Sequence, residues 1–113
     1  MKKQRVSKRA SAPAGALPLR ESEIERSAEM LKALANPARL RLVNLLVGGE
    51  RTVTELCRLS GLKQSLVSQQ LKNLRLNEIV ERRREDSGVY YRIRDDNVIT
   101  MLNCLNRCRC THR

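Results

Sequence analysis

The sequence predicts a mainly α-helical fold with one small β-hairpin, and three observations support this. Aromatic residues make up 2% of the 113 residues, with no Phe and no Trp, so the core must come from Leu, Val, Ile and Ala. Such a core suits packed helices better than a β-sandwich. Apolar residues recur at helical spacing through most of the chain, whereas residues 89–94 alternate as in a strand.

Residues 1–18 differ from the rest of the chain and are expected to form a basic, disordered tail. Six Lys and Arg and no acid lie within residues 1–20, so about half of the net charge of +11 belongs to this end. The tail also lacks enough periodic apolar residues to pack. We therefore expect one folded domain in residues 19–113, with a core small enough that dimerisation would bury further apolar surface.

Charge and hydropathy limit the partners of the chain. The positive charge favours a polyanion, because basic side chains near phosphates release condensed counterions. No stretch has the continuous apolar character of a signal peptide or a membrane-spanning helix, so we expect a cytoplasmic protein with no membrane partner. In that reducing compartment the four cysteines are expected to be thiols, and no CxxC pair is present.

Two helices are predicted before residue 50. Ser22 and Glu25 form a capping-box pattern at the start of the first, and Asn36 with Pro37 ends it and opens the second. The first helix repeats apolar residues at helical spacing, namely Ile24, Ala28, Leu31 and Ala35. The second is expected to bury a stripe of three residues, namely Leu40, Val43 and Val47. It should stop at residues 48 and 49, a glycine pair suited to a left-handed cap.

A third and a fourth helix follow with the spacing of a helix-turn-helix. Thr52 and Glu55 repeat the capping-box pattern at the start of the third helix. Leu56 and Leu59 are expected to face the core. Gly61 then breaks the chain just before the fourth helix.

The fourth helix, over residues 64–75, has an apolar and a polar side. Its buried side is expected to hold Val67, Leu71 and Leu74. Its polar side holds Gln64, Ser65, Ser68, Gln69, Lys72 and Arg75. Glutamine and serine can bond base edges, so the first four are candidates for reading DNA bases. Lys63, Lys72 and Arg75 are candidates for phosphate contacts. An ordinary amphipathic surface helix would show the same segregation.

A β-hairpin is predicted after this helix. The first strand begins at Ile79 and Val80 and continues through the charged residues 81–84. The chain turns at residues 86–88 and returns over residues 89–94. A basic hairpin beside a helix that fits the major groove can reach the adjacent DNA backbone.

Alternation on the return strand separates two faces. The face that can pack holds Val89, Tyr91 and Ile93. The other holds Tyr90, Arg92 and Arg94. We expect Arg83, Arg84 and Arg92 to contact the DNA backbone. By itself, the charge run would also suit a solvated edge that discourages aggregation.

Three motifs in this order resemble the ArsR/SmtB family of repressors. They are LKALANPARLRLVNLL at residues 31–46, TVTELCRLSGLKQSLVSQQLKNLR at residues 52–75, and VYYRIRDDNV at residues 89–98. The resemblance covers about residues 31–110. It implies a winged helix-turn-helix of order α-α-α-α-β-β-α and a homodimer joined by its first and last helices. It also implies a repressor that an inducer releases from a palindromic operator.

The chain departs from the family pattern at several positions. Gln70 stands where many relatives have His, and Lys63 stands where relatives often have a Ser helix cap. Of the cysteines that the family's arsenic sensors carry on the third helix, only Cys57 is kept, with Thr52 and Thr54 at two ligand positions. Of the family's zinc ligands, Asp95 is matched, but three histidine positions hold Asn97, Cys108 and Thr111. The standard sensing sites are therefore incomplete.

The remaining candidates for an effector site are Cys104, Cys108 and Cys110 at the last helix. Cys104 and Cys108 are four residues apart, so both sulfurs lie on one side. They border the expected dimer stripe, which is formed by Val98, Met101, Leu102 and Leu105. A thiolate-bound soft metal or metalloid such as arsenite would use three thiols, whereas disulfide or persulfide formation needs two. They could instead be small interface hydrophobes, and Cys57 is expected to be one in the core. No obligatory cofactor is expected.

Two other classes of function fit the sequence less well. An enzyme would need a polar catalytic constellation, and the chain has one histidine, His112, and no recognisable nucleophile with its base. An architectural or RNA-associated basic protein needs only charge and remains the alternative. The affinity for a palindromic duplex relative to a scrambled one separates it from a sequence-specific repressor.

Overall fold

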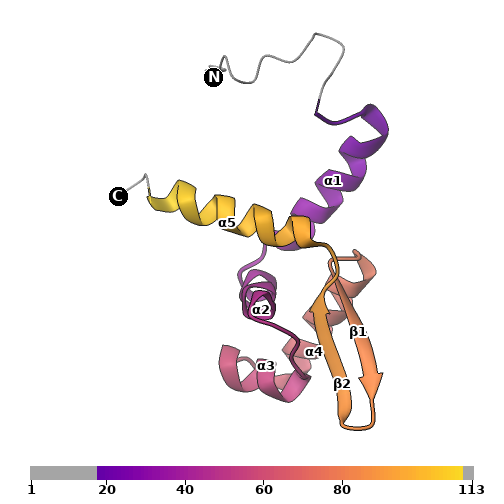
Figure 1. Ribbon diagram of the computed structural model, residues 1–113, viewed down its shortest axis with the longest axis vertical. Coiled ribbons are helices and arrows are strands. Elements are labelled where there is room, and N and C mark those ends of the chain that lie inside the picture. The colour runs from indigo at the N-terminus through magenta and orange to yellow at the C-terminus, as the bar shows by residue number, and fades with distance from the viewer. Residues whose placement is uncertain (1–17, 111–113) are drawn as a thin grey trace.

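The computed structural model describes residues 18–110, with side chains through Cys108. Five helices and one hairpin follow each other in the expected order (Figure 1). They are α1 (Glu21–Leu34), α2 (Pro37–Val47), α3 (Val53–Ser60), α4 (Gln64–Leu76), β1 (Val80–Glu85), β2 (Gly88–Ile93) and α5 (Asp96–Cys110). The expected tail lies almost wholly outside the described residues, as does His112, so the prediction of disorder stays a prediction.

The core lies where α2, α3, α4 and the hairpin meet. Its fully buried side chains are Leu42, Val43, Leu56, Val67, Leu71, Leu74, Ile79, Val80 and Val98. No polar or charged residue is buried in the described part of the chain. Helices α1 and α5 both start from one end of this body and extend away from it in different directions, whereas α3 and the hairpin tip lie at the other end (Figure 1). The fold therefore separates a helix-turn-helix end from an α1–α5 end.

The first helix begins two residues earlier than the sequence suggested. Arg20 is the cap residue, and its backbone N–H donates to Glu23 Oε1 at 3.1 Å. Glu23 is the third helical residue, which is the position from which an acidic side chain can reach back to the cap. The predicted Ser22–Glu25 box is wrong, because Ser22 already lies inside the helix.

The buried side of α2 also differs from the predicted stripe. Leu42, Val43 and Leu46 are buried, whereas Val47 is 38% exposed. Since α2 contacts α1, α3, α4 and β2, its core-facing surface is broad and a narrow stripe does not describe it. The helix ends at Gly48 in a right-handed conformation, and the positive φ of 136° falls on Gly49 instead.

The turn between α3 and α4 forms as predicted. Thr52 Oγ1 accepts from the Glu55 N–H at 3.1 Å, and Glu55 Oε1 accepts from the Thr52 N–H at 2.9 Å. Gly61 adopts φ 75°, a left-handed conformation that glycine reaches without steric cost. Leu56 is buried, but Leu59 is 41% exposed and does not face the core as expected. The Thr52 cap fixes where α3 begins and the Gly61 cap fixes where it ends, so α4 starts directly after this turn.

The hairpin, which we call the wing, pairs β1 and β2 antiparallel. Directly opposed residues share a face, so Arg82 opposite Tyr91 and Arg84 opposite Val89 lie on the core-side face. Arg83 lies opposite Tyr90 on the outer face. The predicted alternation is therefore confirmed, and it separates neighbouring arginines of β1.

A backbone bridge holds the wing to the segment between α2 and α3. The Arg51 N–H donates to the Tyr91 carbonyl oxygen at 3.0 Å, and the Tyr91 N–H donates back to the Arg51 carbonyl oxygen at 2.8 Å. The Arg51 side chain also donates from Nε to the Leu45 carbonyl oxygen at 2.9 Å. The wing is thus anchored to the end of α2.

The joint between α4 and β1 contains a strained residue. Glu78 has φ 61° and is the one non-glycine residue with positive φ in the described chain. For a residue with a Cβ atom this conformation costs roughly 1–2 kcal/mol. The Glu78 side chain stabilises the fold little, because its contact with Arg94 is a solvent-exposed ion pair of 3.8 Å.

Glu78→Gly should raise the free energy of unfolding by about 0.5–1 kcal/mol, because relief of the strained φ exceeds the added chain entropy. Urea denaturation measures the change. Glu78→Ala is the control, since it removes the same ion pair but keeps the Cβ atom. Equal stabilities of the two variants would contradict the strain at this joint.

Candidate nucleic-acid interface

Helix α4 presents the polar side that the sequence predicted. Val67, Leu71 and Leu74 have no exposed surface. The opposite side carries four exposed residues, Gln64, Ser65, Ser68 and Gln69, which we call the reading face. Lys63, at the N-cap of the helix, and Lys72 are also exposed. The structure brings all of these side chains onto one helix, beside the tight turn at Gly61.

Arg75 lies less exposed than the other candidate phosphate contacts. Its side chain is half-buried near the end of α4, and its Nε has no hydrogen-bond partner among the described residues. Most buried N–H donors in folded proteins have an acceptor, so Arg75 Nε is an exception within the described residues.

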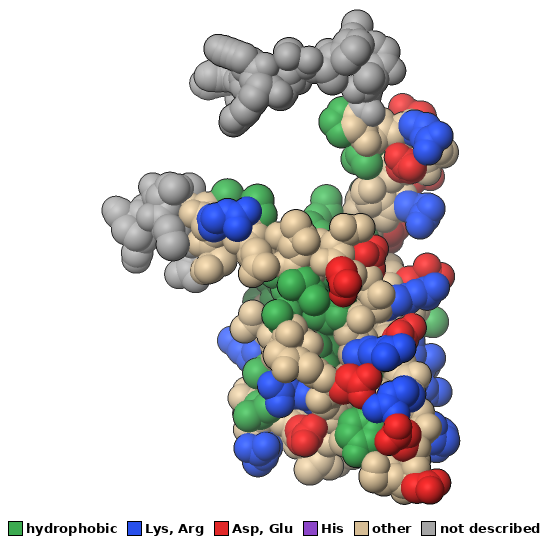
Figure 2. Space-filling view, in the orientation of Figure 1, with side chains coloured by type: hydrophobic (Ala, Val, Ile, Leu, Met, Phe, Trp, Pro, Cys, Tyr) green, Lys and Arg blue, Asp and Glu red, His purple; other side chains and the backbone are tan. Residues whose placement is uncertain are grey.

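On the outer face of the wing, five side chains form an ion-pair cluster: Glu50, Glu81, Arg83, Glu85 and Arg92. Arg83 is paired with Glu50 and Glu85 and lies over the Tyr90 ring, 5.4 Å from its centroid. Arg92 Nε lies 2.7 Å from Glu81 Oε2 and its Nη1 lies 3.3 Å from Glu50 Oε2. Figure 2 shows the alternating basic and acidic side chains along the hairpin edge of the molecule.

The cluster also lowers the pKa of Glu50. The hydrogen bond from Arg83 holds the pKa of the Glu50 carboxyl below its ordinary value, and nearby Arg92 acts in the same direction. Glu50 is therefore charged at neutral pH. Arg83 and Arg92, which were predicted to contact phosphates, are therefore paired with carboxylates of the same chain when no DNA is bound.

Arg82 and Arg84 differ from this pair. Both are exposed, and neither makes an ion pair with any residue between 18 and 108. Arg84 is one of the phosphate contacts predicted from the sequence, whereas Arg82 is not. The register gives the signal that would have found it, because residues two apart on a strand share a face.

Arg39 connects three helices through hydrogen bonds. Its Nη1 donates to Gln70 Oε1 on α4 at 2.8 Å, and its Nε donates to the Ala33 carbonyl oxygen in the last turn of α1. Its backbone N–H donates to Asn36 Oδ1, the cap of α2, at 3.1 Å. The Gln70 side chain therefore turns toward the protein, unlike its neighbour Gln69 on the reading face.

The predicted cysteine residues divide between the core and α5. Cys57 is half-buried and packs against the core. Cys104 and Cys108 are exposed on α5, and Cys110 is its last residue. No group of three or more His, Cys, Asp or Glu side chains in the described part of the chain is placed to hold a metal ion. The side chain of Cys110 lies outside that part.

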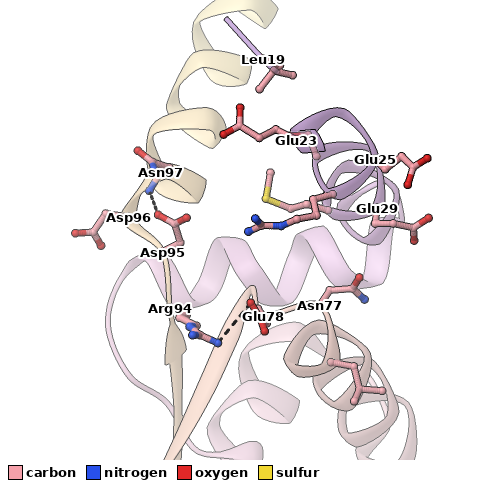
Figure 3. Close-up of a pocket in the computed structure, with 14 residues that line it drawn as sticks. Leu19, Glu23, Glu25, Glu29, Asn77, Glu78, Arg94, Asp95, Asp96 and Asn97 are labelled. Carbon is pink, nitrogen blue, oxygen red and sulfur yellow. Dashed lines mark hydrogen bonds and ion pairs between the residues drawn. The ribbon is translucent and has the colours of Figure 1, made fainter. Parts of the chain in front are cut away.

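An open cleft of about 1110 Å³ separates α1 from the end of α4 and from the β2–α5 junction (Figure 3). Six carboxylates line it: Glu23, Glu25, Glu29, Glu78, Asp95 and Asp96. Asp95 Oδ1 accepts from the Asn97 N–H at 2.9 Å, so this carboxylate caps α5. The acidic lining disfavours phosphate binding in this cleft. The cleft therefore lies apart from the reading face, which is at the start of α4, at the other end of that helix.

None of the helices within residues 18–110 is long and apolar enough to cross a membrane.

Arg39→Met should lower the free energy of unfolding by about 1–3 kcal/mol, because it leaves the Ala33 carbonyl and the Gln70 amide without their donor. Thermal or urea denaturation measures this loss. Arg41→Met is the matched control, since Arg41 is exposed on the same helix and its loss should change stability by less than about 0.5 kcal/mol. Equal effects would show that the three-helix connection contributes nothing.

Comparison with known proteins places this geometry in a family. Residues 36–82 match the model of the bacterial regulatory proteins of the arsR family. The biofilm growth-associated repressor of Xylella fastidiosa (strain Temecula1) is 40% identical over 91 residues, which cover 80% of each chain. Nodulation protein NolR of Rhizobium meliloti is 37% identical over 89 residues, covering 79% of this chain and 73% of NolR.

Solved structures agree with these sequence matches. HlyU from Vibrio cholerae superposes with a TM-score of 0.73 at 34% identity, covering 80% of this chain and 99% of HlyU. The homodimeric winged helix-turn-helix DNA-binding domain of Mb0332 from Mycobacterium bovis gives a TM-score of 0.74 at 31% identity, covering 88% and 93% of the two chains. The protein described here therefore belongs to the ArsR family and is a DNA-binding transcriptional regulator with a winged helix-turn-helix fold.

Proposed function

We propose that the protein is a homodimeric repressor that reads a palindromic operator with α4 and is released by a thiol-reactive effector. The separation of the two sides of α4 is the observation that carries this proposal. Three fully buried residues fix the helix rotation, and the reading face is exposed as a consequence. Such a regulator acts where bacterial DNA lies, in the cytoplasm.

The chemistry of the reading face supports base recognition. A glutamine can bond adenine with two hydrogen bonds, and serine can donate to or accept from several base edges. Residues near the start of a recognition helix are the ones that usually reach the bases. We assign phosphate contacts to Lys63, Lys72, Arg75 and Arg84. Arg83 and Arg92 would have to exchange internal carboxylates for phosphate.

Exposed apolar residues on α1 and α5 support a homodimer joined by these helices. Ile24 is 44% exposed, and Leu31 and Leu105 are each 51% exposed. A second copy of the chain would remove this surface from water, and the Mb0332 domain is homodimeric. A two-fold axis would then present two α4 helices to half-sites roughly one helical turn, about 34 Å, apart.

Gln64→Ala or Ser68→Ala should weaken binding to the preferred duplex by about 1–3 kcal/mol, because each removes hydrogen bonds to a base. The preferred duplex is the one that the parent protein enriches from a random-sequence pool. Fluorescence anisotropy at fixed salt measures affinity for it and for a scrambled duplex. Asn44→Ala, an exposed change on α2, is the control.

An equal loss on both duplexes would contradict base reading. A parent protein that does not distinguish the two duplexes would instead favour the alternative of a non-specific architectural or RNA-associated protein. The same assay therefore tests the proposal and its alternative.

We assign the effector site to Cys104 and Cys108, with Cys110 as a third thiol only where the end of α5 unwinds or a second copy of the chain supplies a group. The first two are four residues apart and exposed on α5, which the proposal places in the dimer. Trivalent arsenic or another soft ion prefers thiolate ligands, and an oxidant or a persulfide donor needs only the pair. A switch from 1:99 to 99:1 requires about 5.5 kcal/mol of differential affinity, which several thiolate bonds can supply more readily than one.

Cys104→Ser or Cys108→Ser should give a repressor that binds DNA but no longer responds to the effector, because the site loses a ligand. Release from the duplex is measured for the reduced protein with arsenite, antimonite, cadmium, zinc, peroxide and a persulfide donor. Cys57→Ser is the control and should respond normally, since Cys57 packs against the core. Release of a Cys104/Cys108 double variant at the parent's effector concentration would exclude this pair.

A further inference from the structure

The four arginines at the centre of the wing form two pairs on opposite faces, and the two pairs differ in how free they are to contact an external anion. Arg82 and Arg84 project from the core-side face without an ion pair to any described residue. Arg83 and Arg92 lie on the outer face and are paired with carboxylates. The net charge of the hairpin alone does not distinguish the paired arginines from the unpaired ones.

We propose that Glu50 is a specificity-determining residue, because it keeps Arg83 and Arg92 from contacting phosphates. It limits the attraction of the wing for DNA of any sequence, so that the reading face decides where the protein binds. The inference rests on the proposed function and adds to it a residue from outside both the recognition helix and the wing.

Both oxygens of the Glu50 carboxylate are used in the cluster. Oε1 pairs with Arg83 Nη2, and Oε2 lies 3.3 Å from Arg92 Nη1. Glu50 is the member of the cluster that contacts both arginines, whereas Glu81 contacts Arg92 and Glu85 contacts Arg83. With three carboxylates and two guanidinium groups, the cluster has a net charge of −1. A phosphate therefore gains nothing from this face while Glu50 is charged.

The position of Glu50 distinguishes it from the other two acids. Glu81 and Glu85 lie on β1 itself, whereas Glu50 lies on the segment between α2 and α3. The adjoining Arg51 is bonded through its backbone to Tyr91, which holds the Glu50 carboxylate beside the wing. These backbone bonds do not depend on the Glu50 charge, so a neutral side chain should leave the wing in place.

The cluster is too exposed to be explained by its contribution to folding alone. The side chains of Glu50, Arg83 and Arg92 are 30%, 36% and 48% exposed. Ion pairs this open to solvent contribute little to stability. By contrast, each phosphate that a protein neutralises on duplex DNA changes the slope of log K against log salt by about 0.9.

Glu50→Gln tests the proposal, because it keeps the shape of the side chain and removes its charge. Affinities for the enriched duplex and for a scrambled duplex are measured over a series of salt concentrations. We expect the scrambled duplex to bind more tightly, with a salt dependence steeper by about 0.9 for each arginine that gains a phosphate. The preference for the enriched duplex should fall.

Two further variants isolate the cause. Glu29→Gln removes one negative charge from the acidic cleft, far from the cluster, and should leave the salt slope unchanged. In a Glu50→Gln/Arg83→Gln/Arg92→Gln variant, the increase seen with Glu50→Gln alone should disappear. Thermal denaturation of each variant verifies that the fold is retained.

The failures of the two proposals are distinguishable. If Glu50→Gln leaves the salt slope and the preference of the parent unchanged, or if Glu29→Gln has the same effect, the role of Glu50 is overturned while the repressor proposal stands. If the parent protein itself shows no preference between the two duplexes, the repressor proposal fails first.

Discussion

The burial of one side of α4 is the constraint on which the rest of this structure depends. Val67, Leu71 and Leu74 are fully removed from water, and each buried side chain of this size contributes on the order of 1.5–3 kcal/mol. The helix cannot rotate without exposing them. Its polar side is therefore held outward, and the Gly61 turn, which ends α3, fixes where α4 can begin.

Charge is distributed unevenly over the two ends of this body. The cleft between α1 and the end of α4 is lined by more acidic than basic residues, whereas the start of α4 and the core-side face of the wing carry exposed basic residues. On the outer face of the wing, acids and bases are balanced within the chain. In the proposed repressor, only part of the basic surface would attract DNA, and hydrogen bonds with bases would supply more of the discrimination between sequences.

The two ends of the fold are connected by specific polar contacts. Arg39 joins the end of α1 to Gln70 on α4, and Gln70 directly follows a residue of the reading face. In the proposed dimer, a change in the position of α1 would reach α4 through this guanidinium. The α1–α5 end carries the exposed apolar residues and the exposed α5 thiols, so the proposed effector site and the reading face lie toward opposite ends of one small core.

Local patterns in the sequence determined the order of elements, the Thr52 cap, the Gly61 turn, the buried residues of α4 and the alternation of β2, because each depends on neighbours within a few residues. Local periodicity failed for Val47 and Leu59, which were expected in the core but are exposed, because the neighbouring elements decide which side of a short helix is buried. The predicted Ser22 cap was also wrong, since the helix begins after Arg20, whose backbone N–H donates to the Glu23 side chain. Only the tertiary structure decided that Arg83 pairs with Glu50, 33 residues away, and that Arg39 bonds Gln70, 31 residues away. Such partners are selected by how the packed elements bring distant side chains within a few ångströms, and no spacing along the chain encodes that proximity.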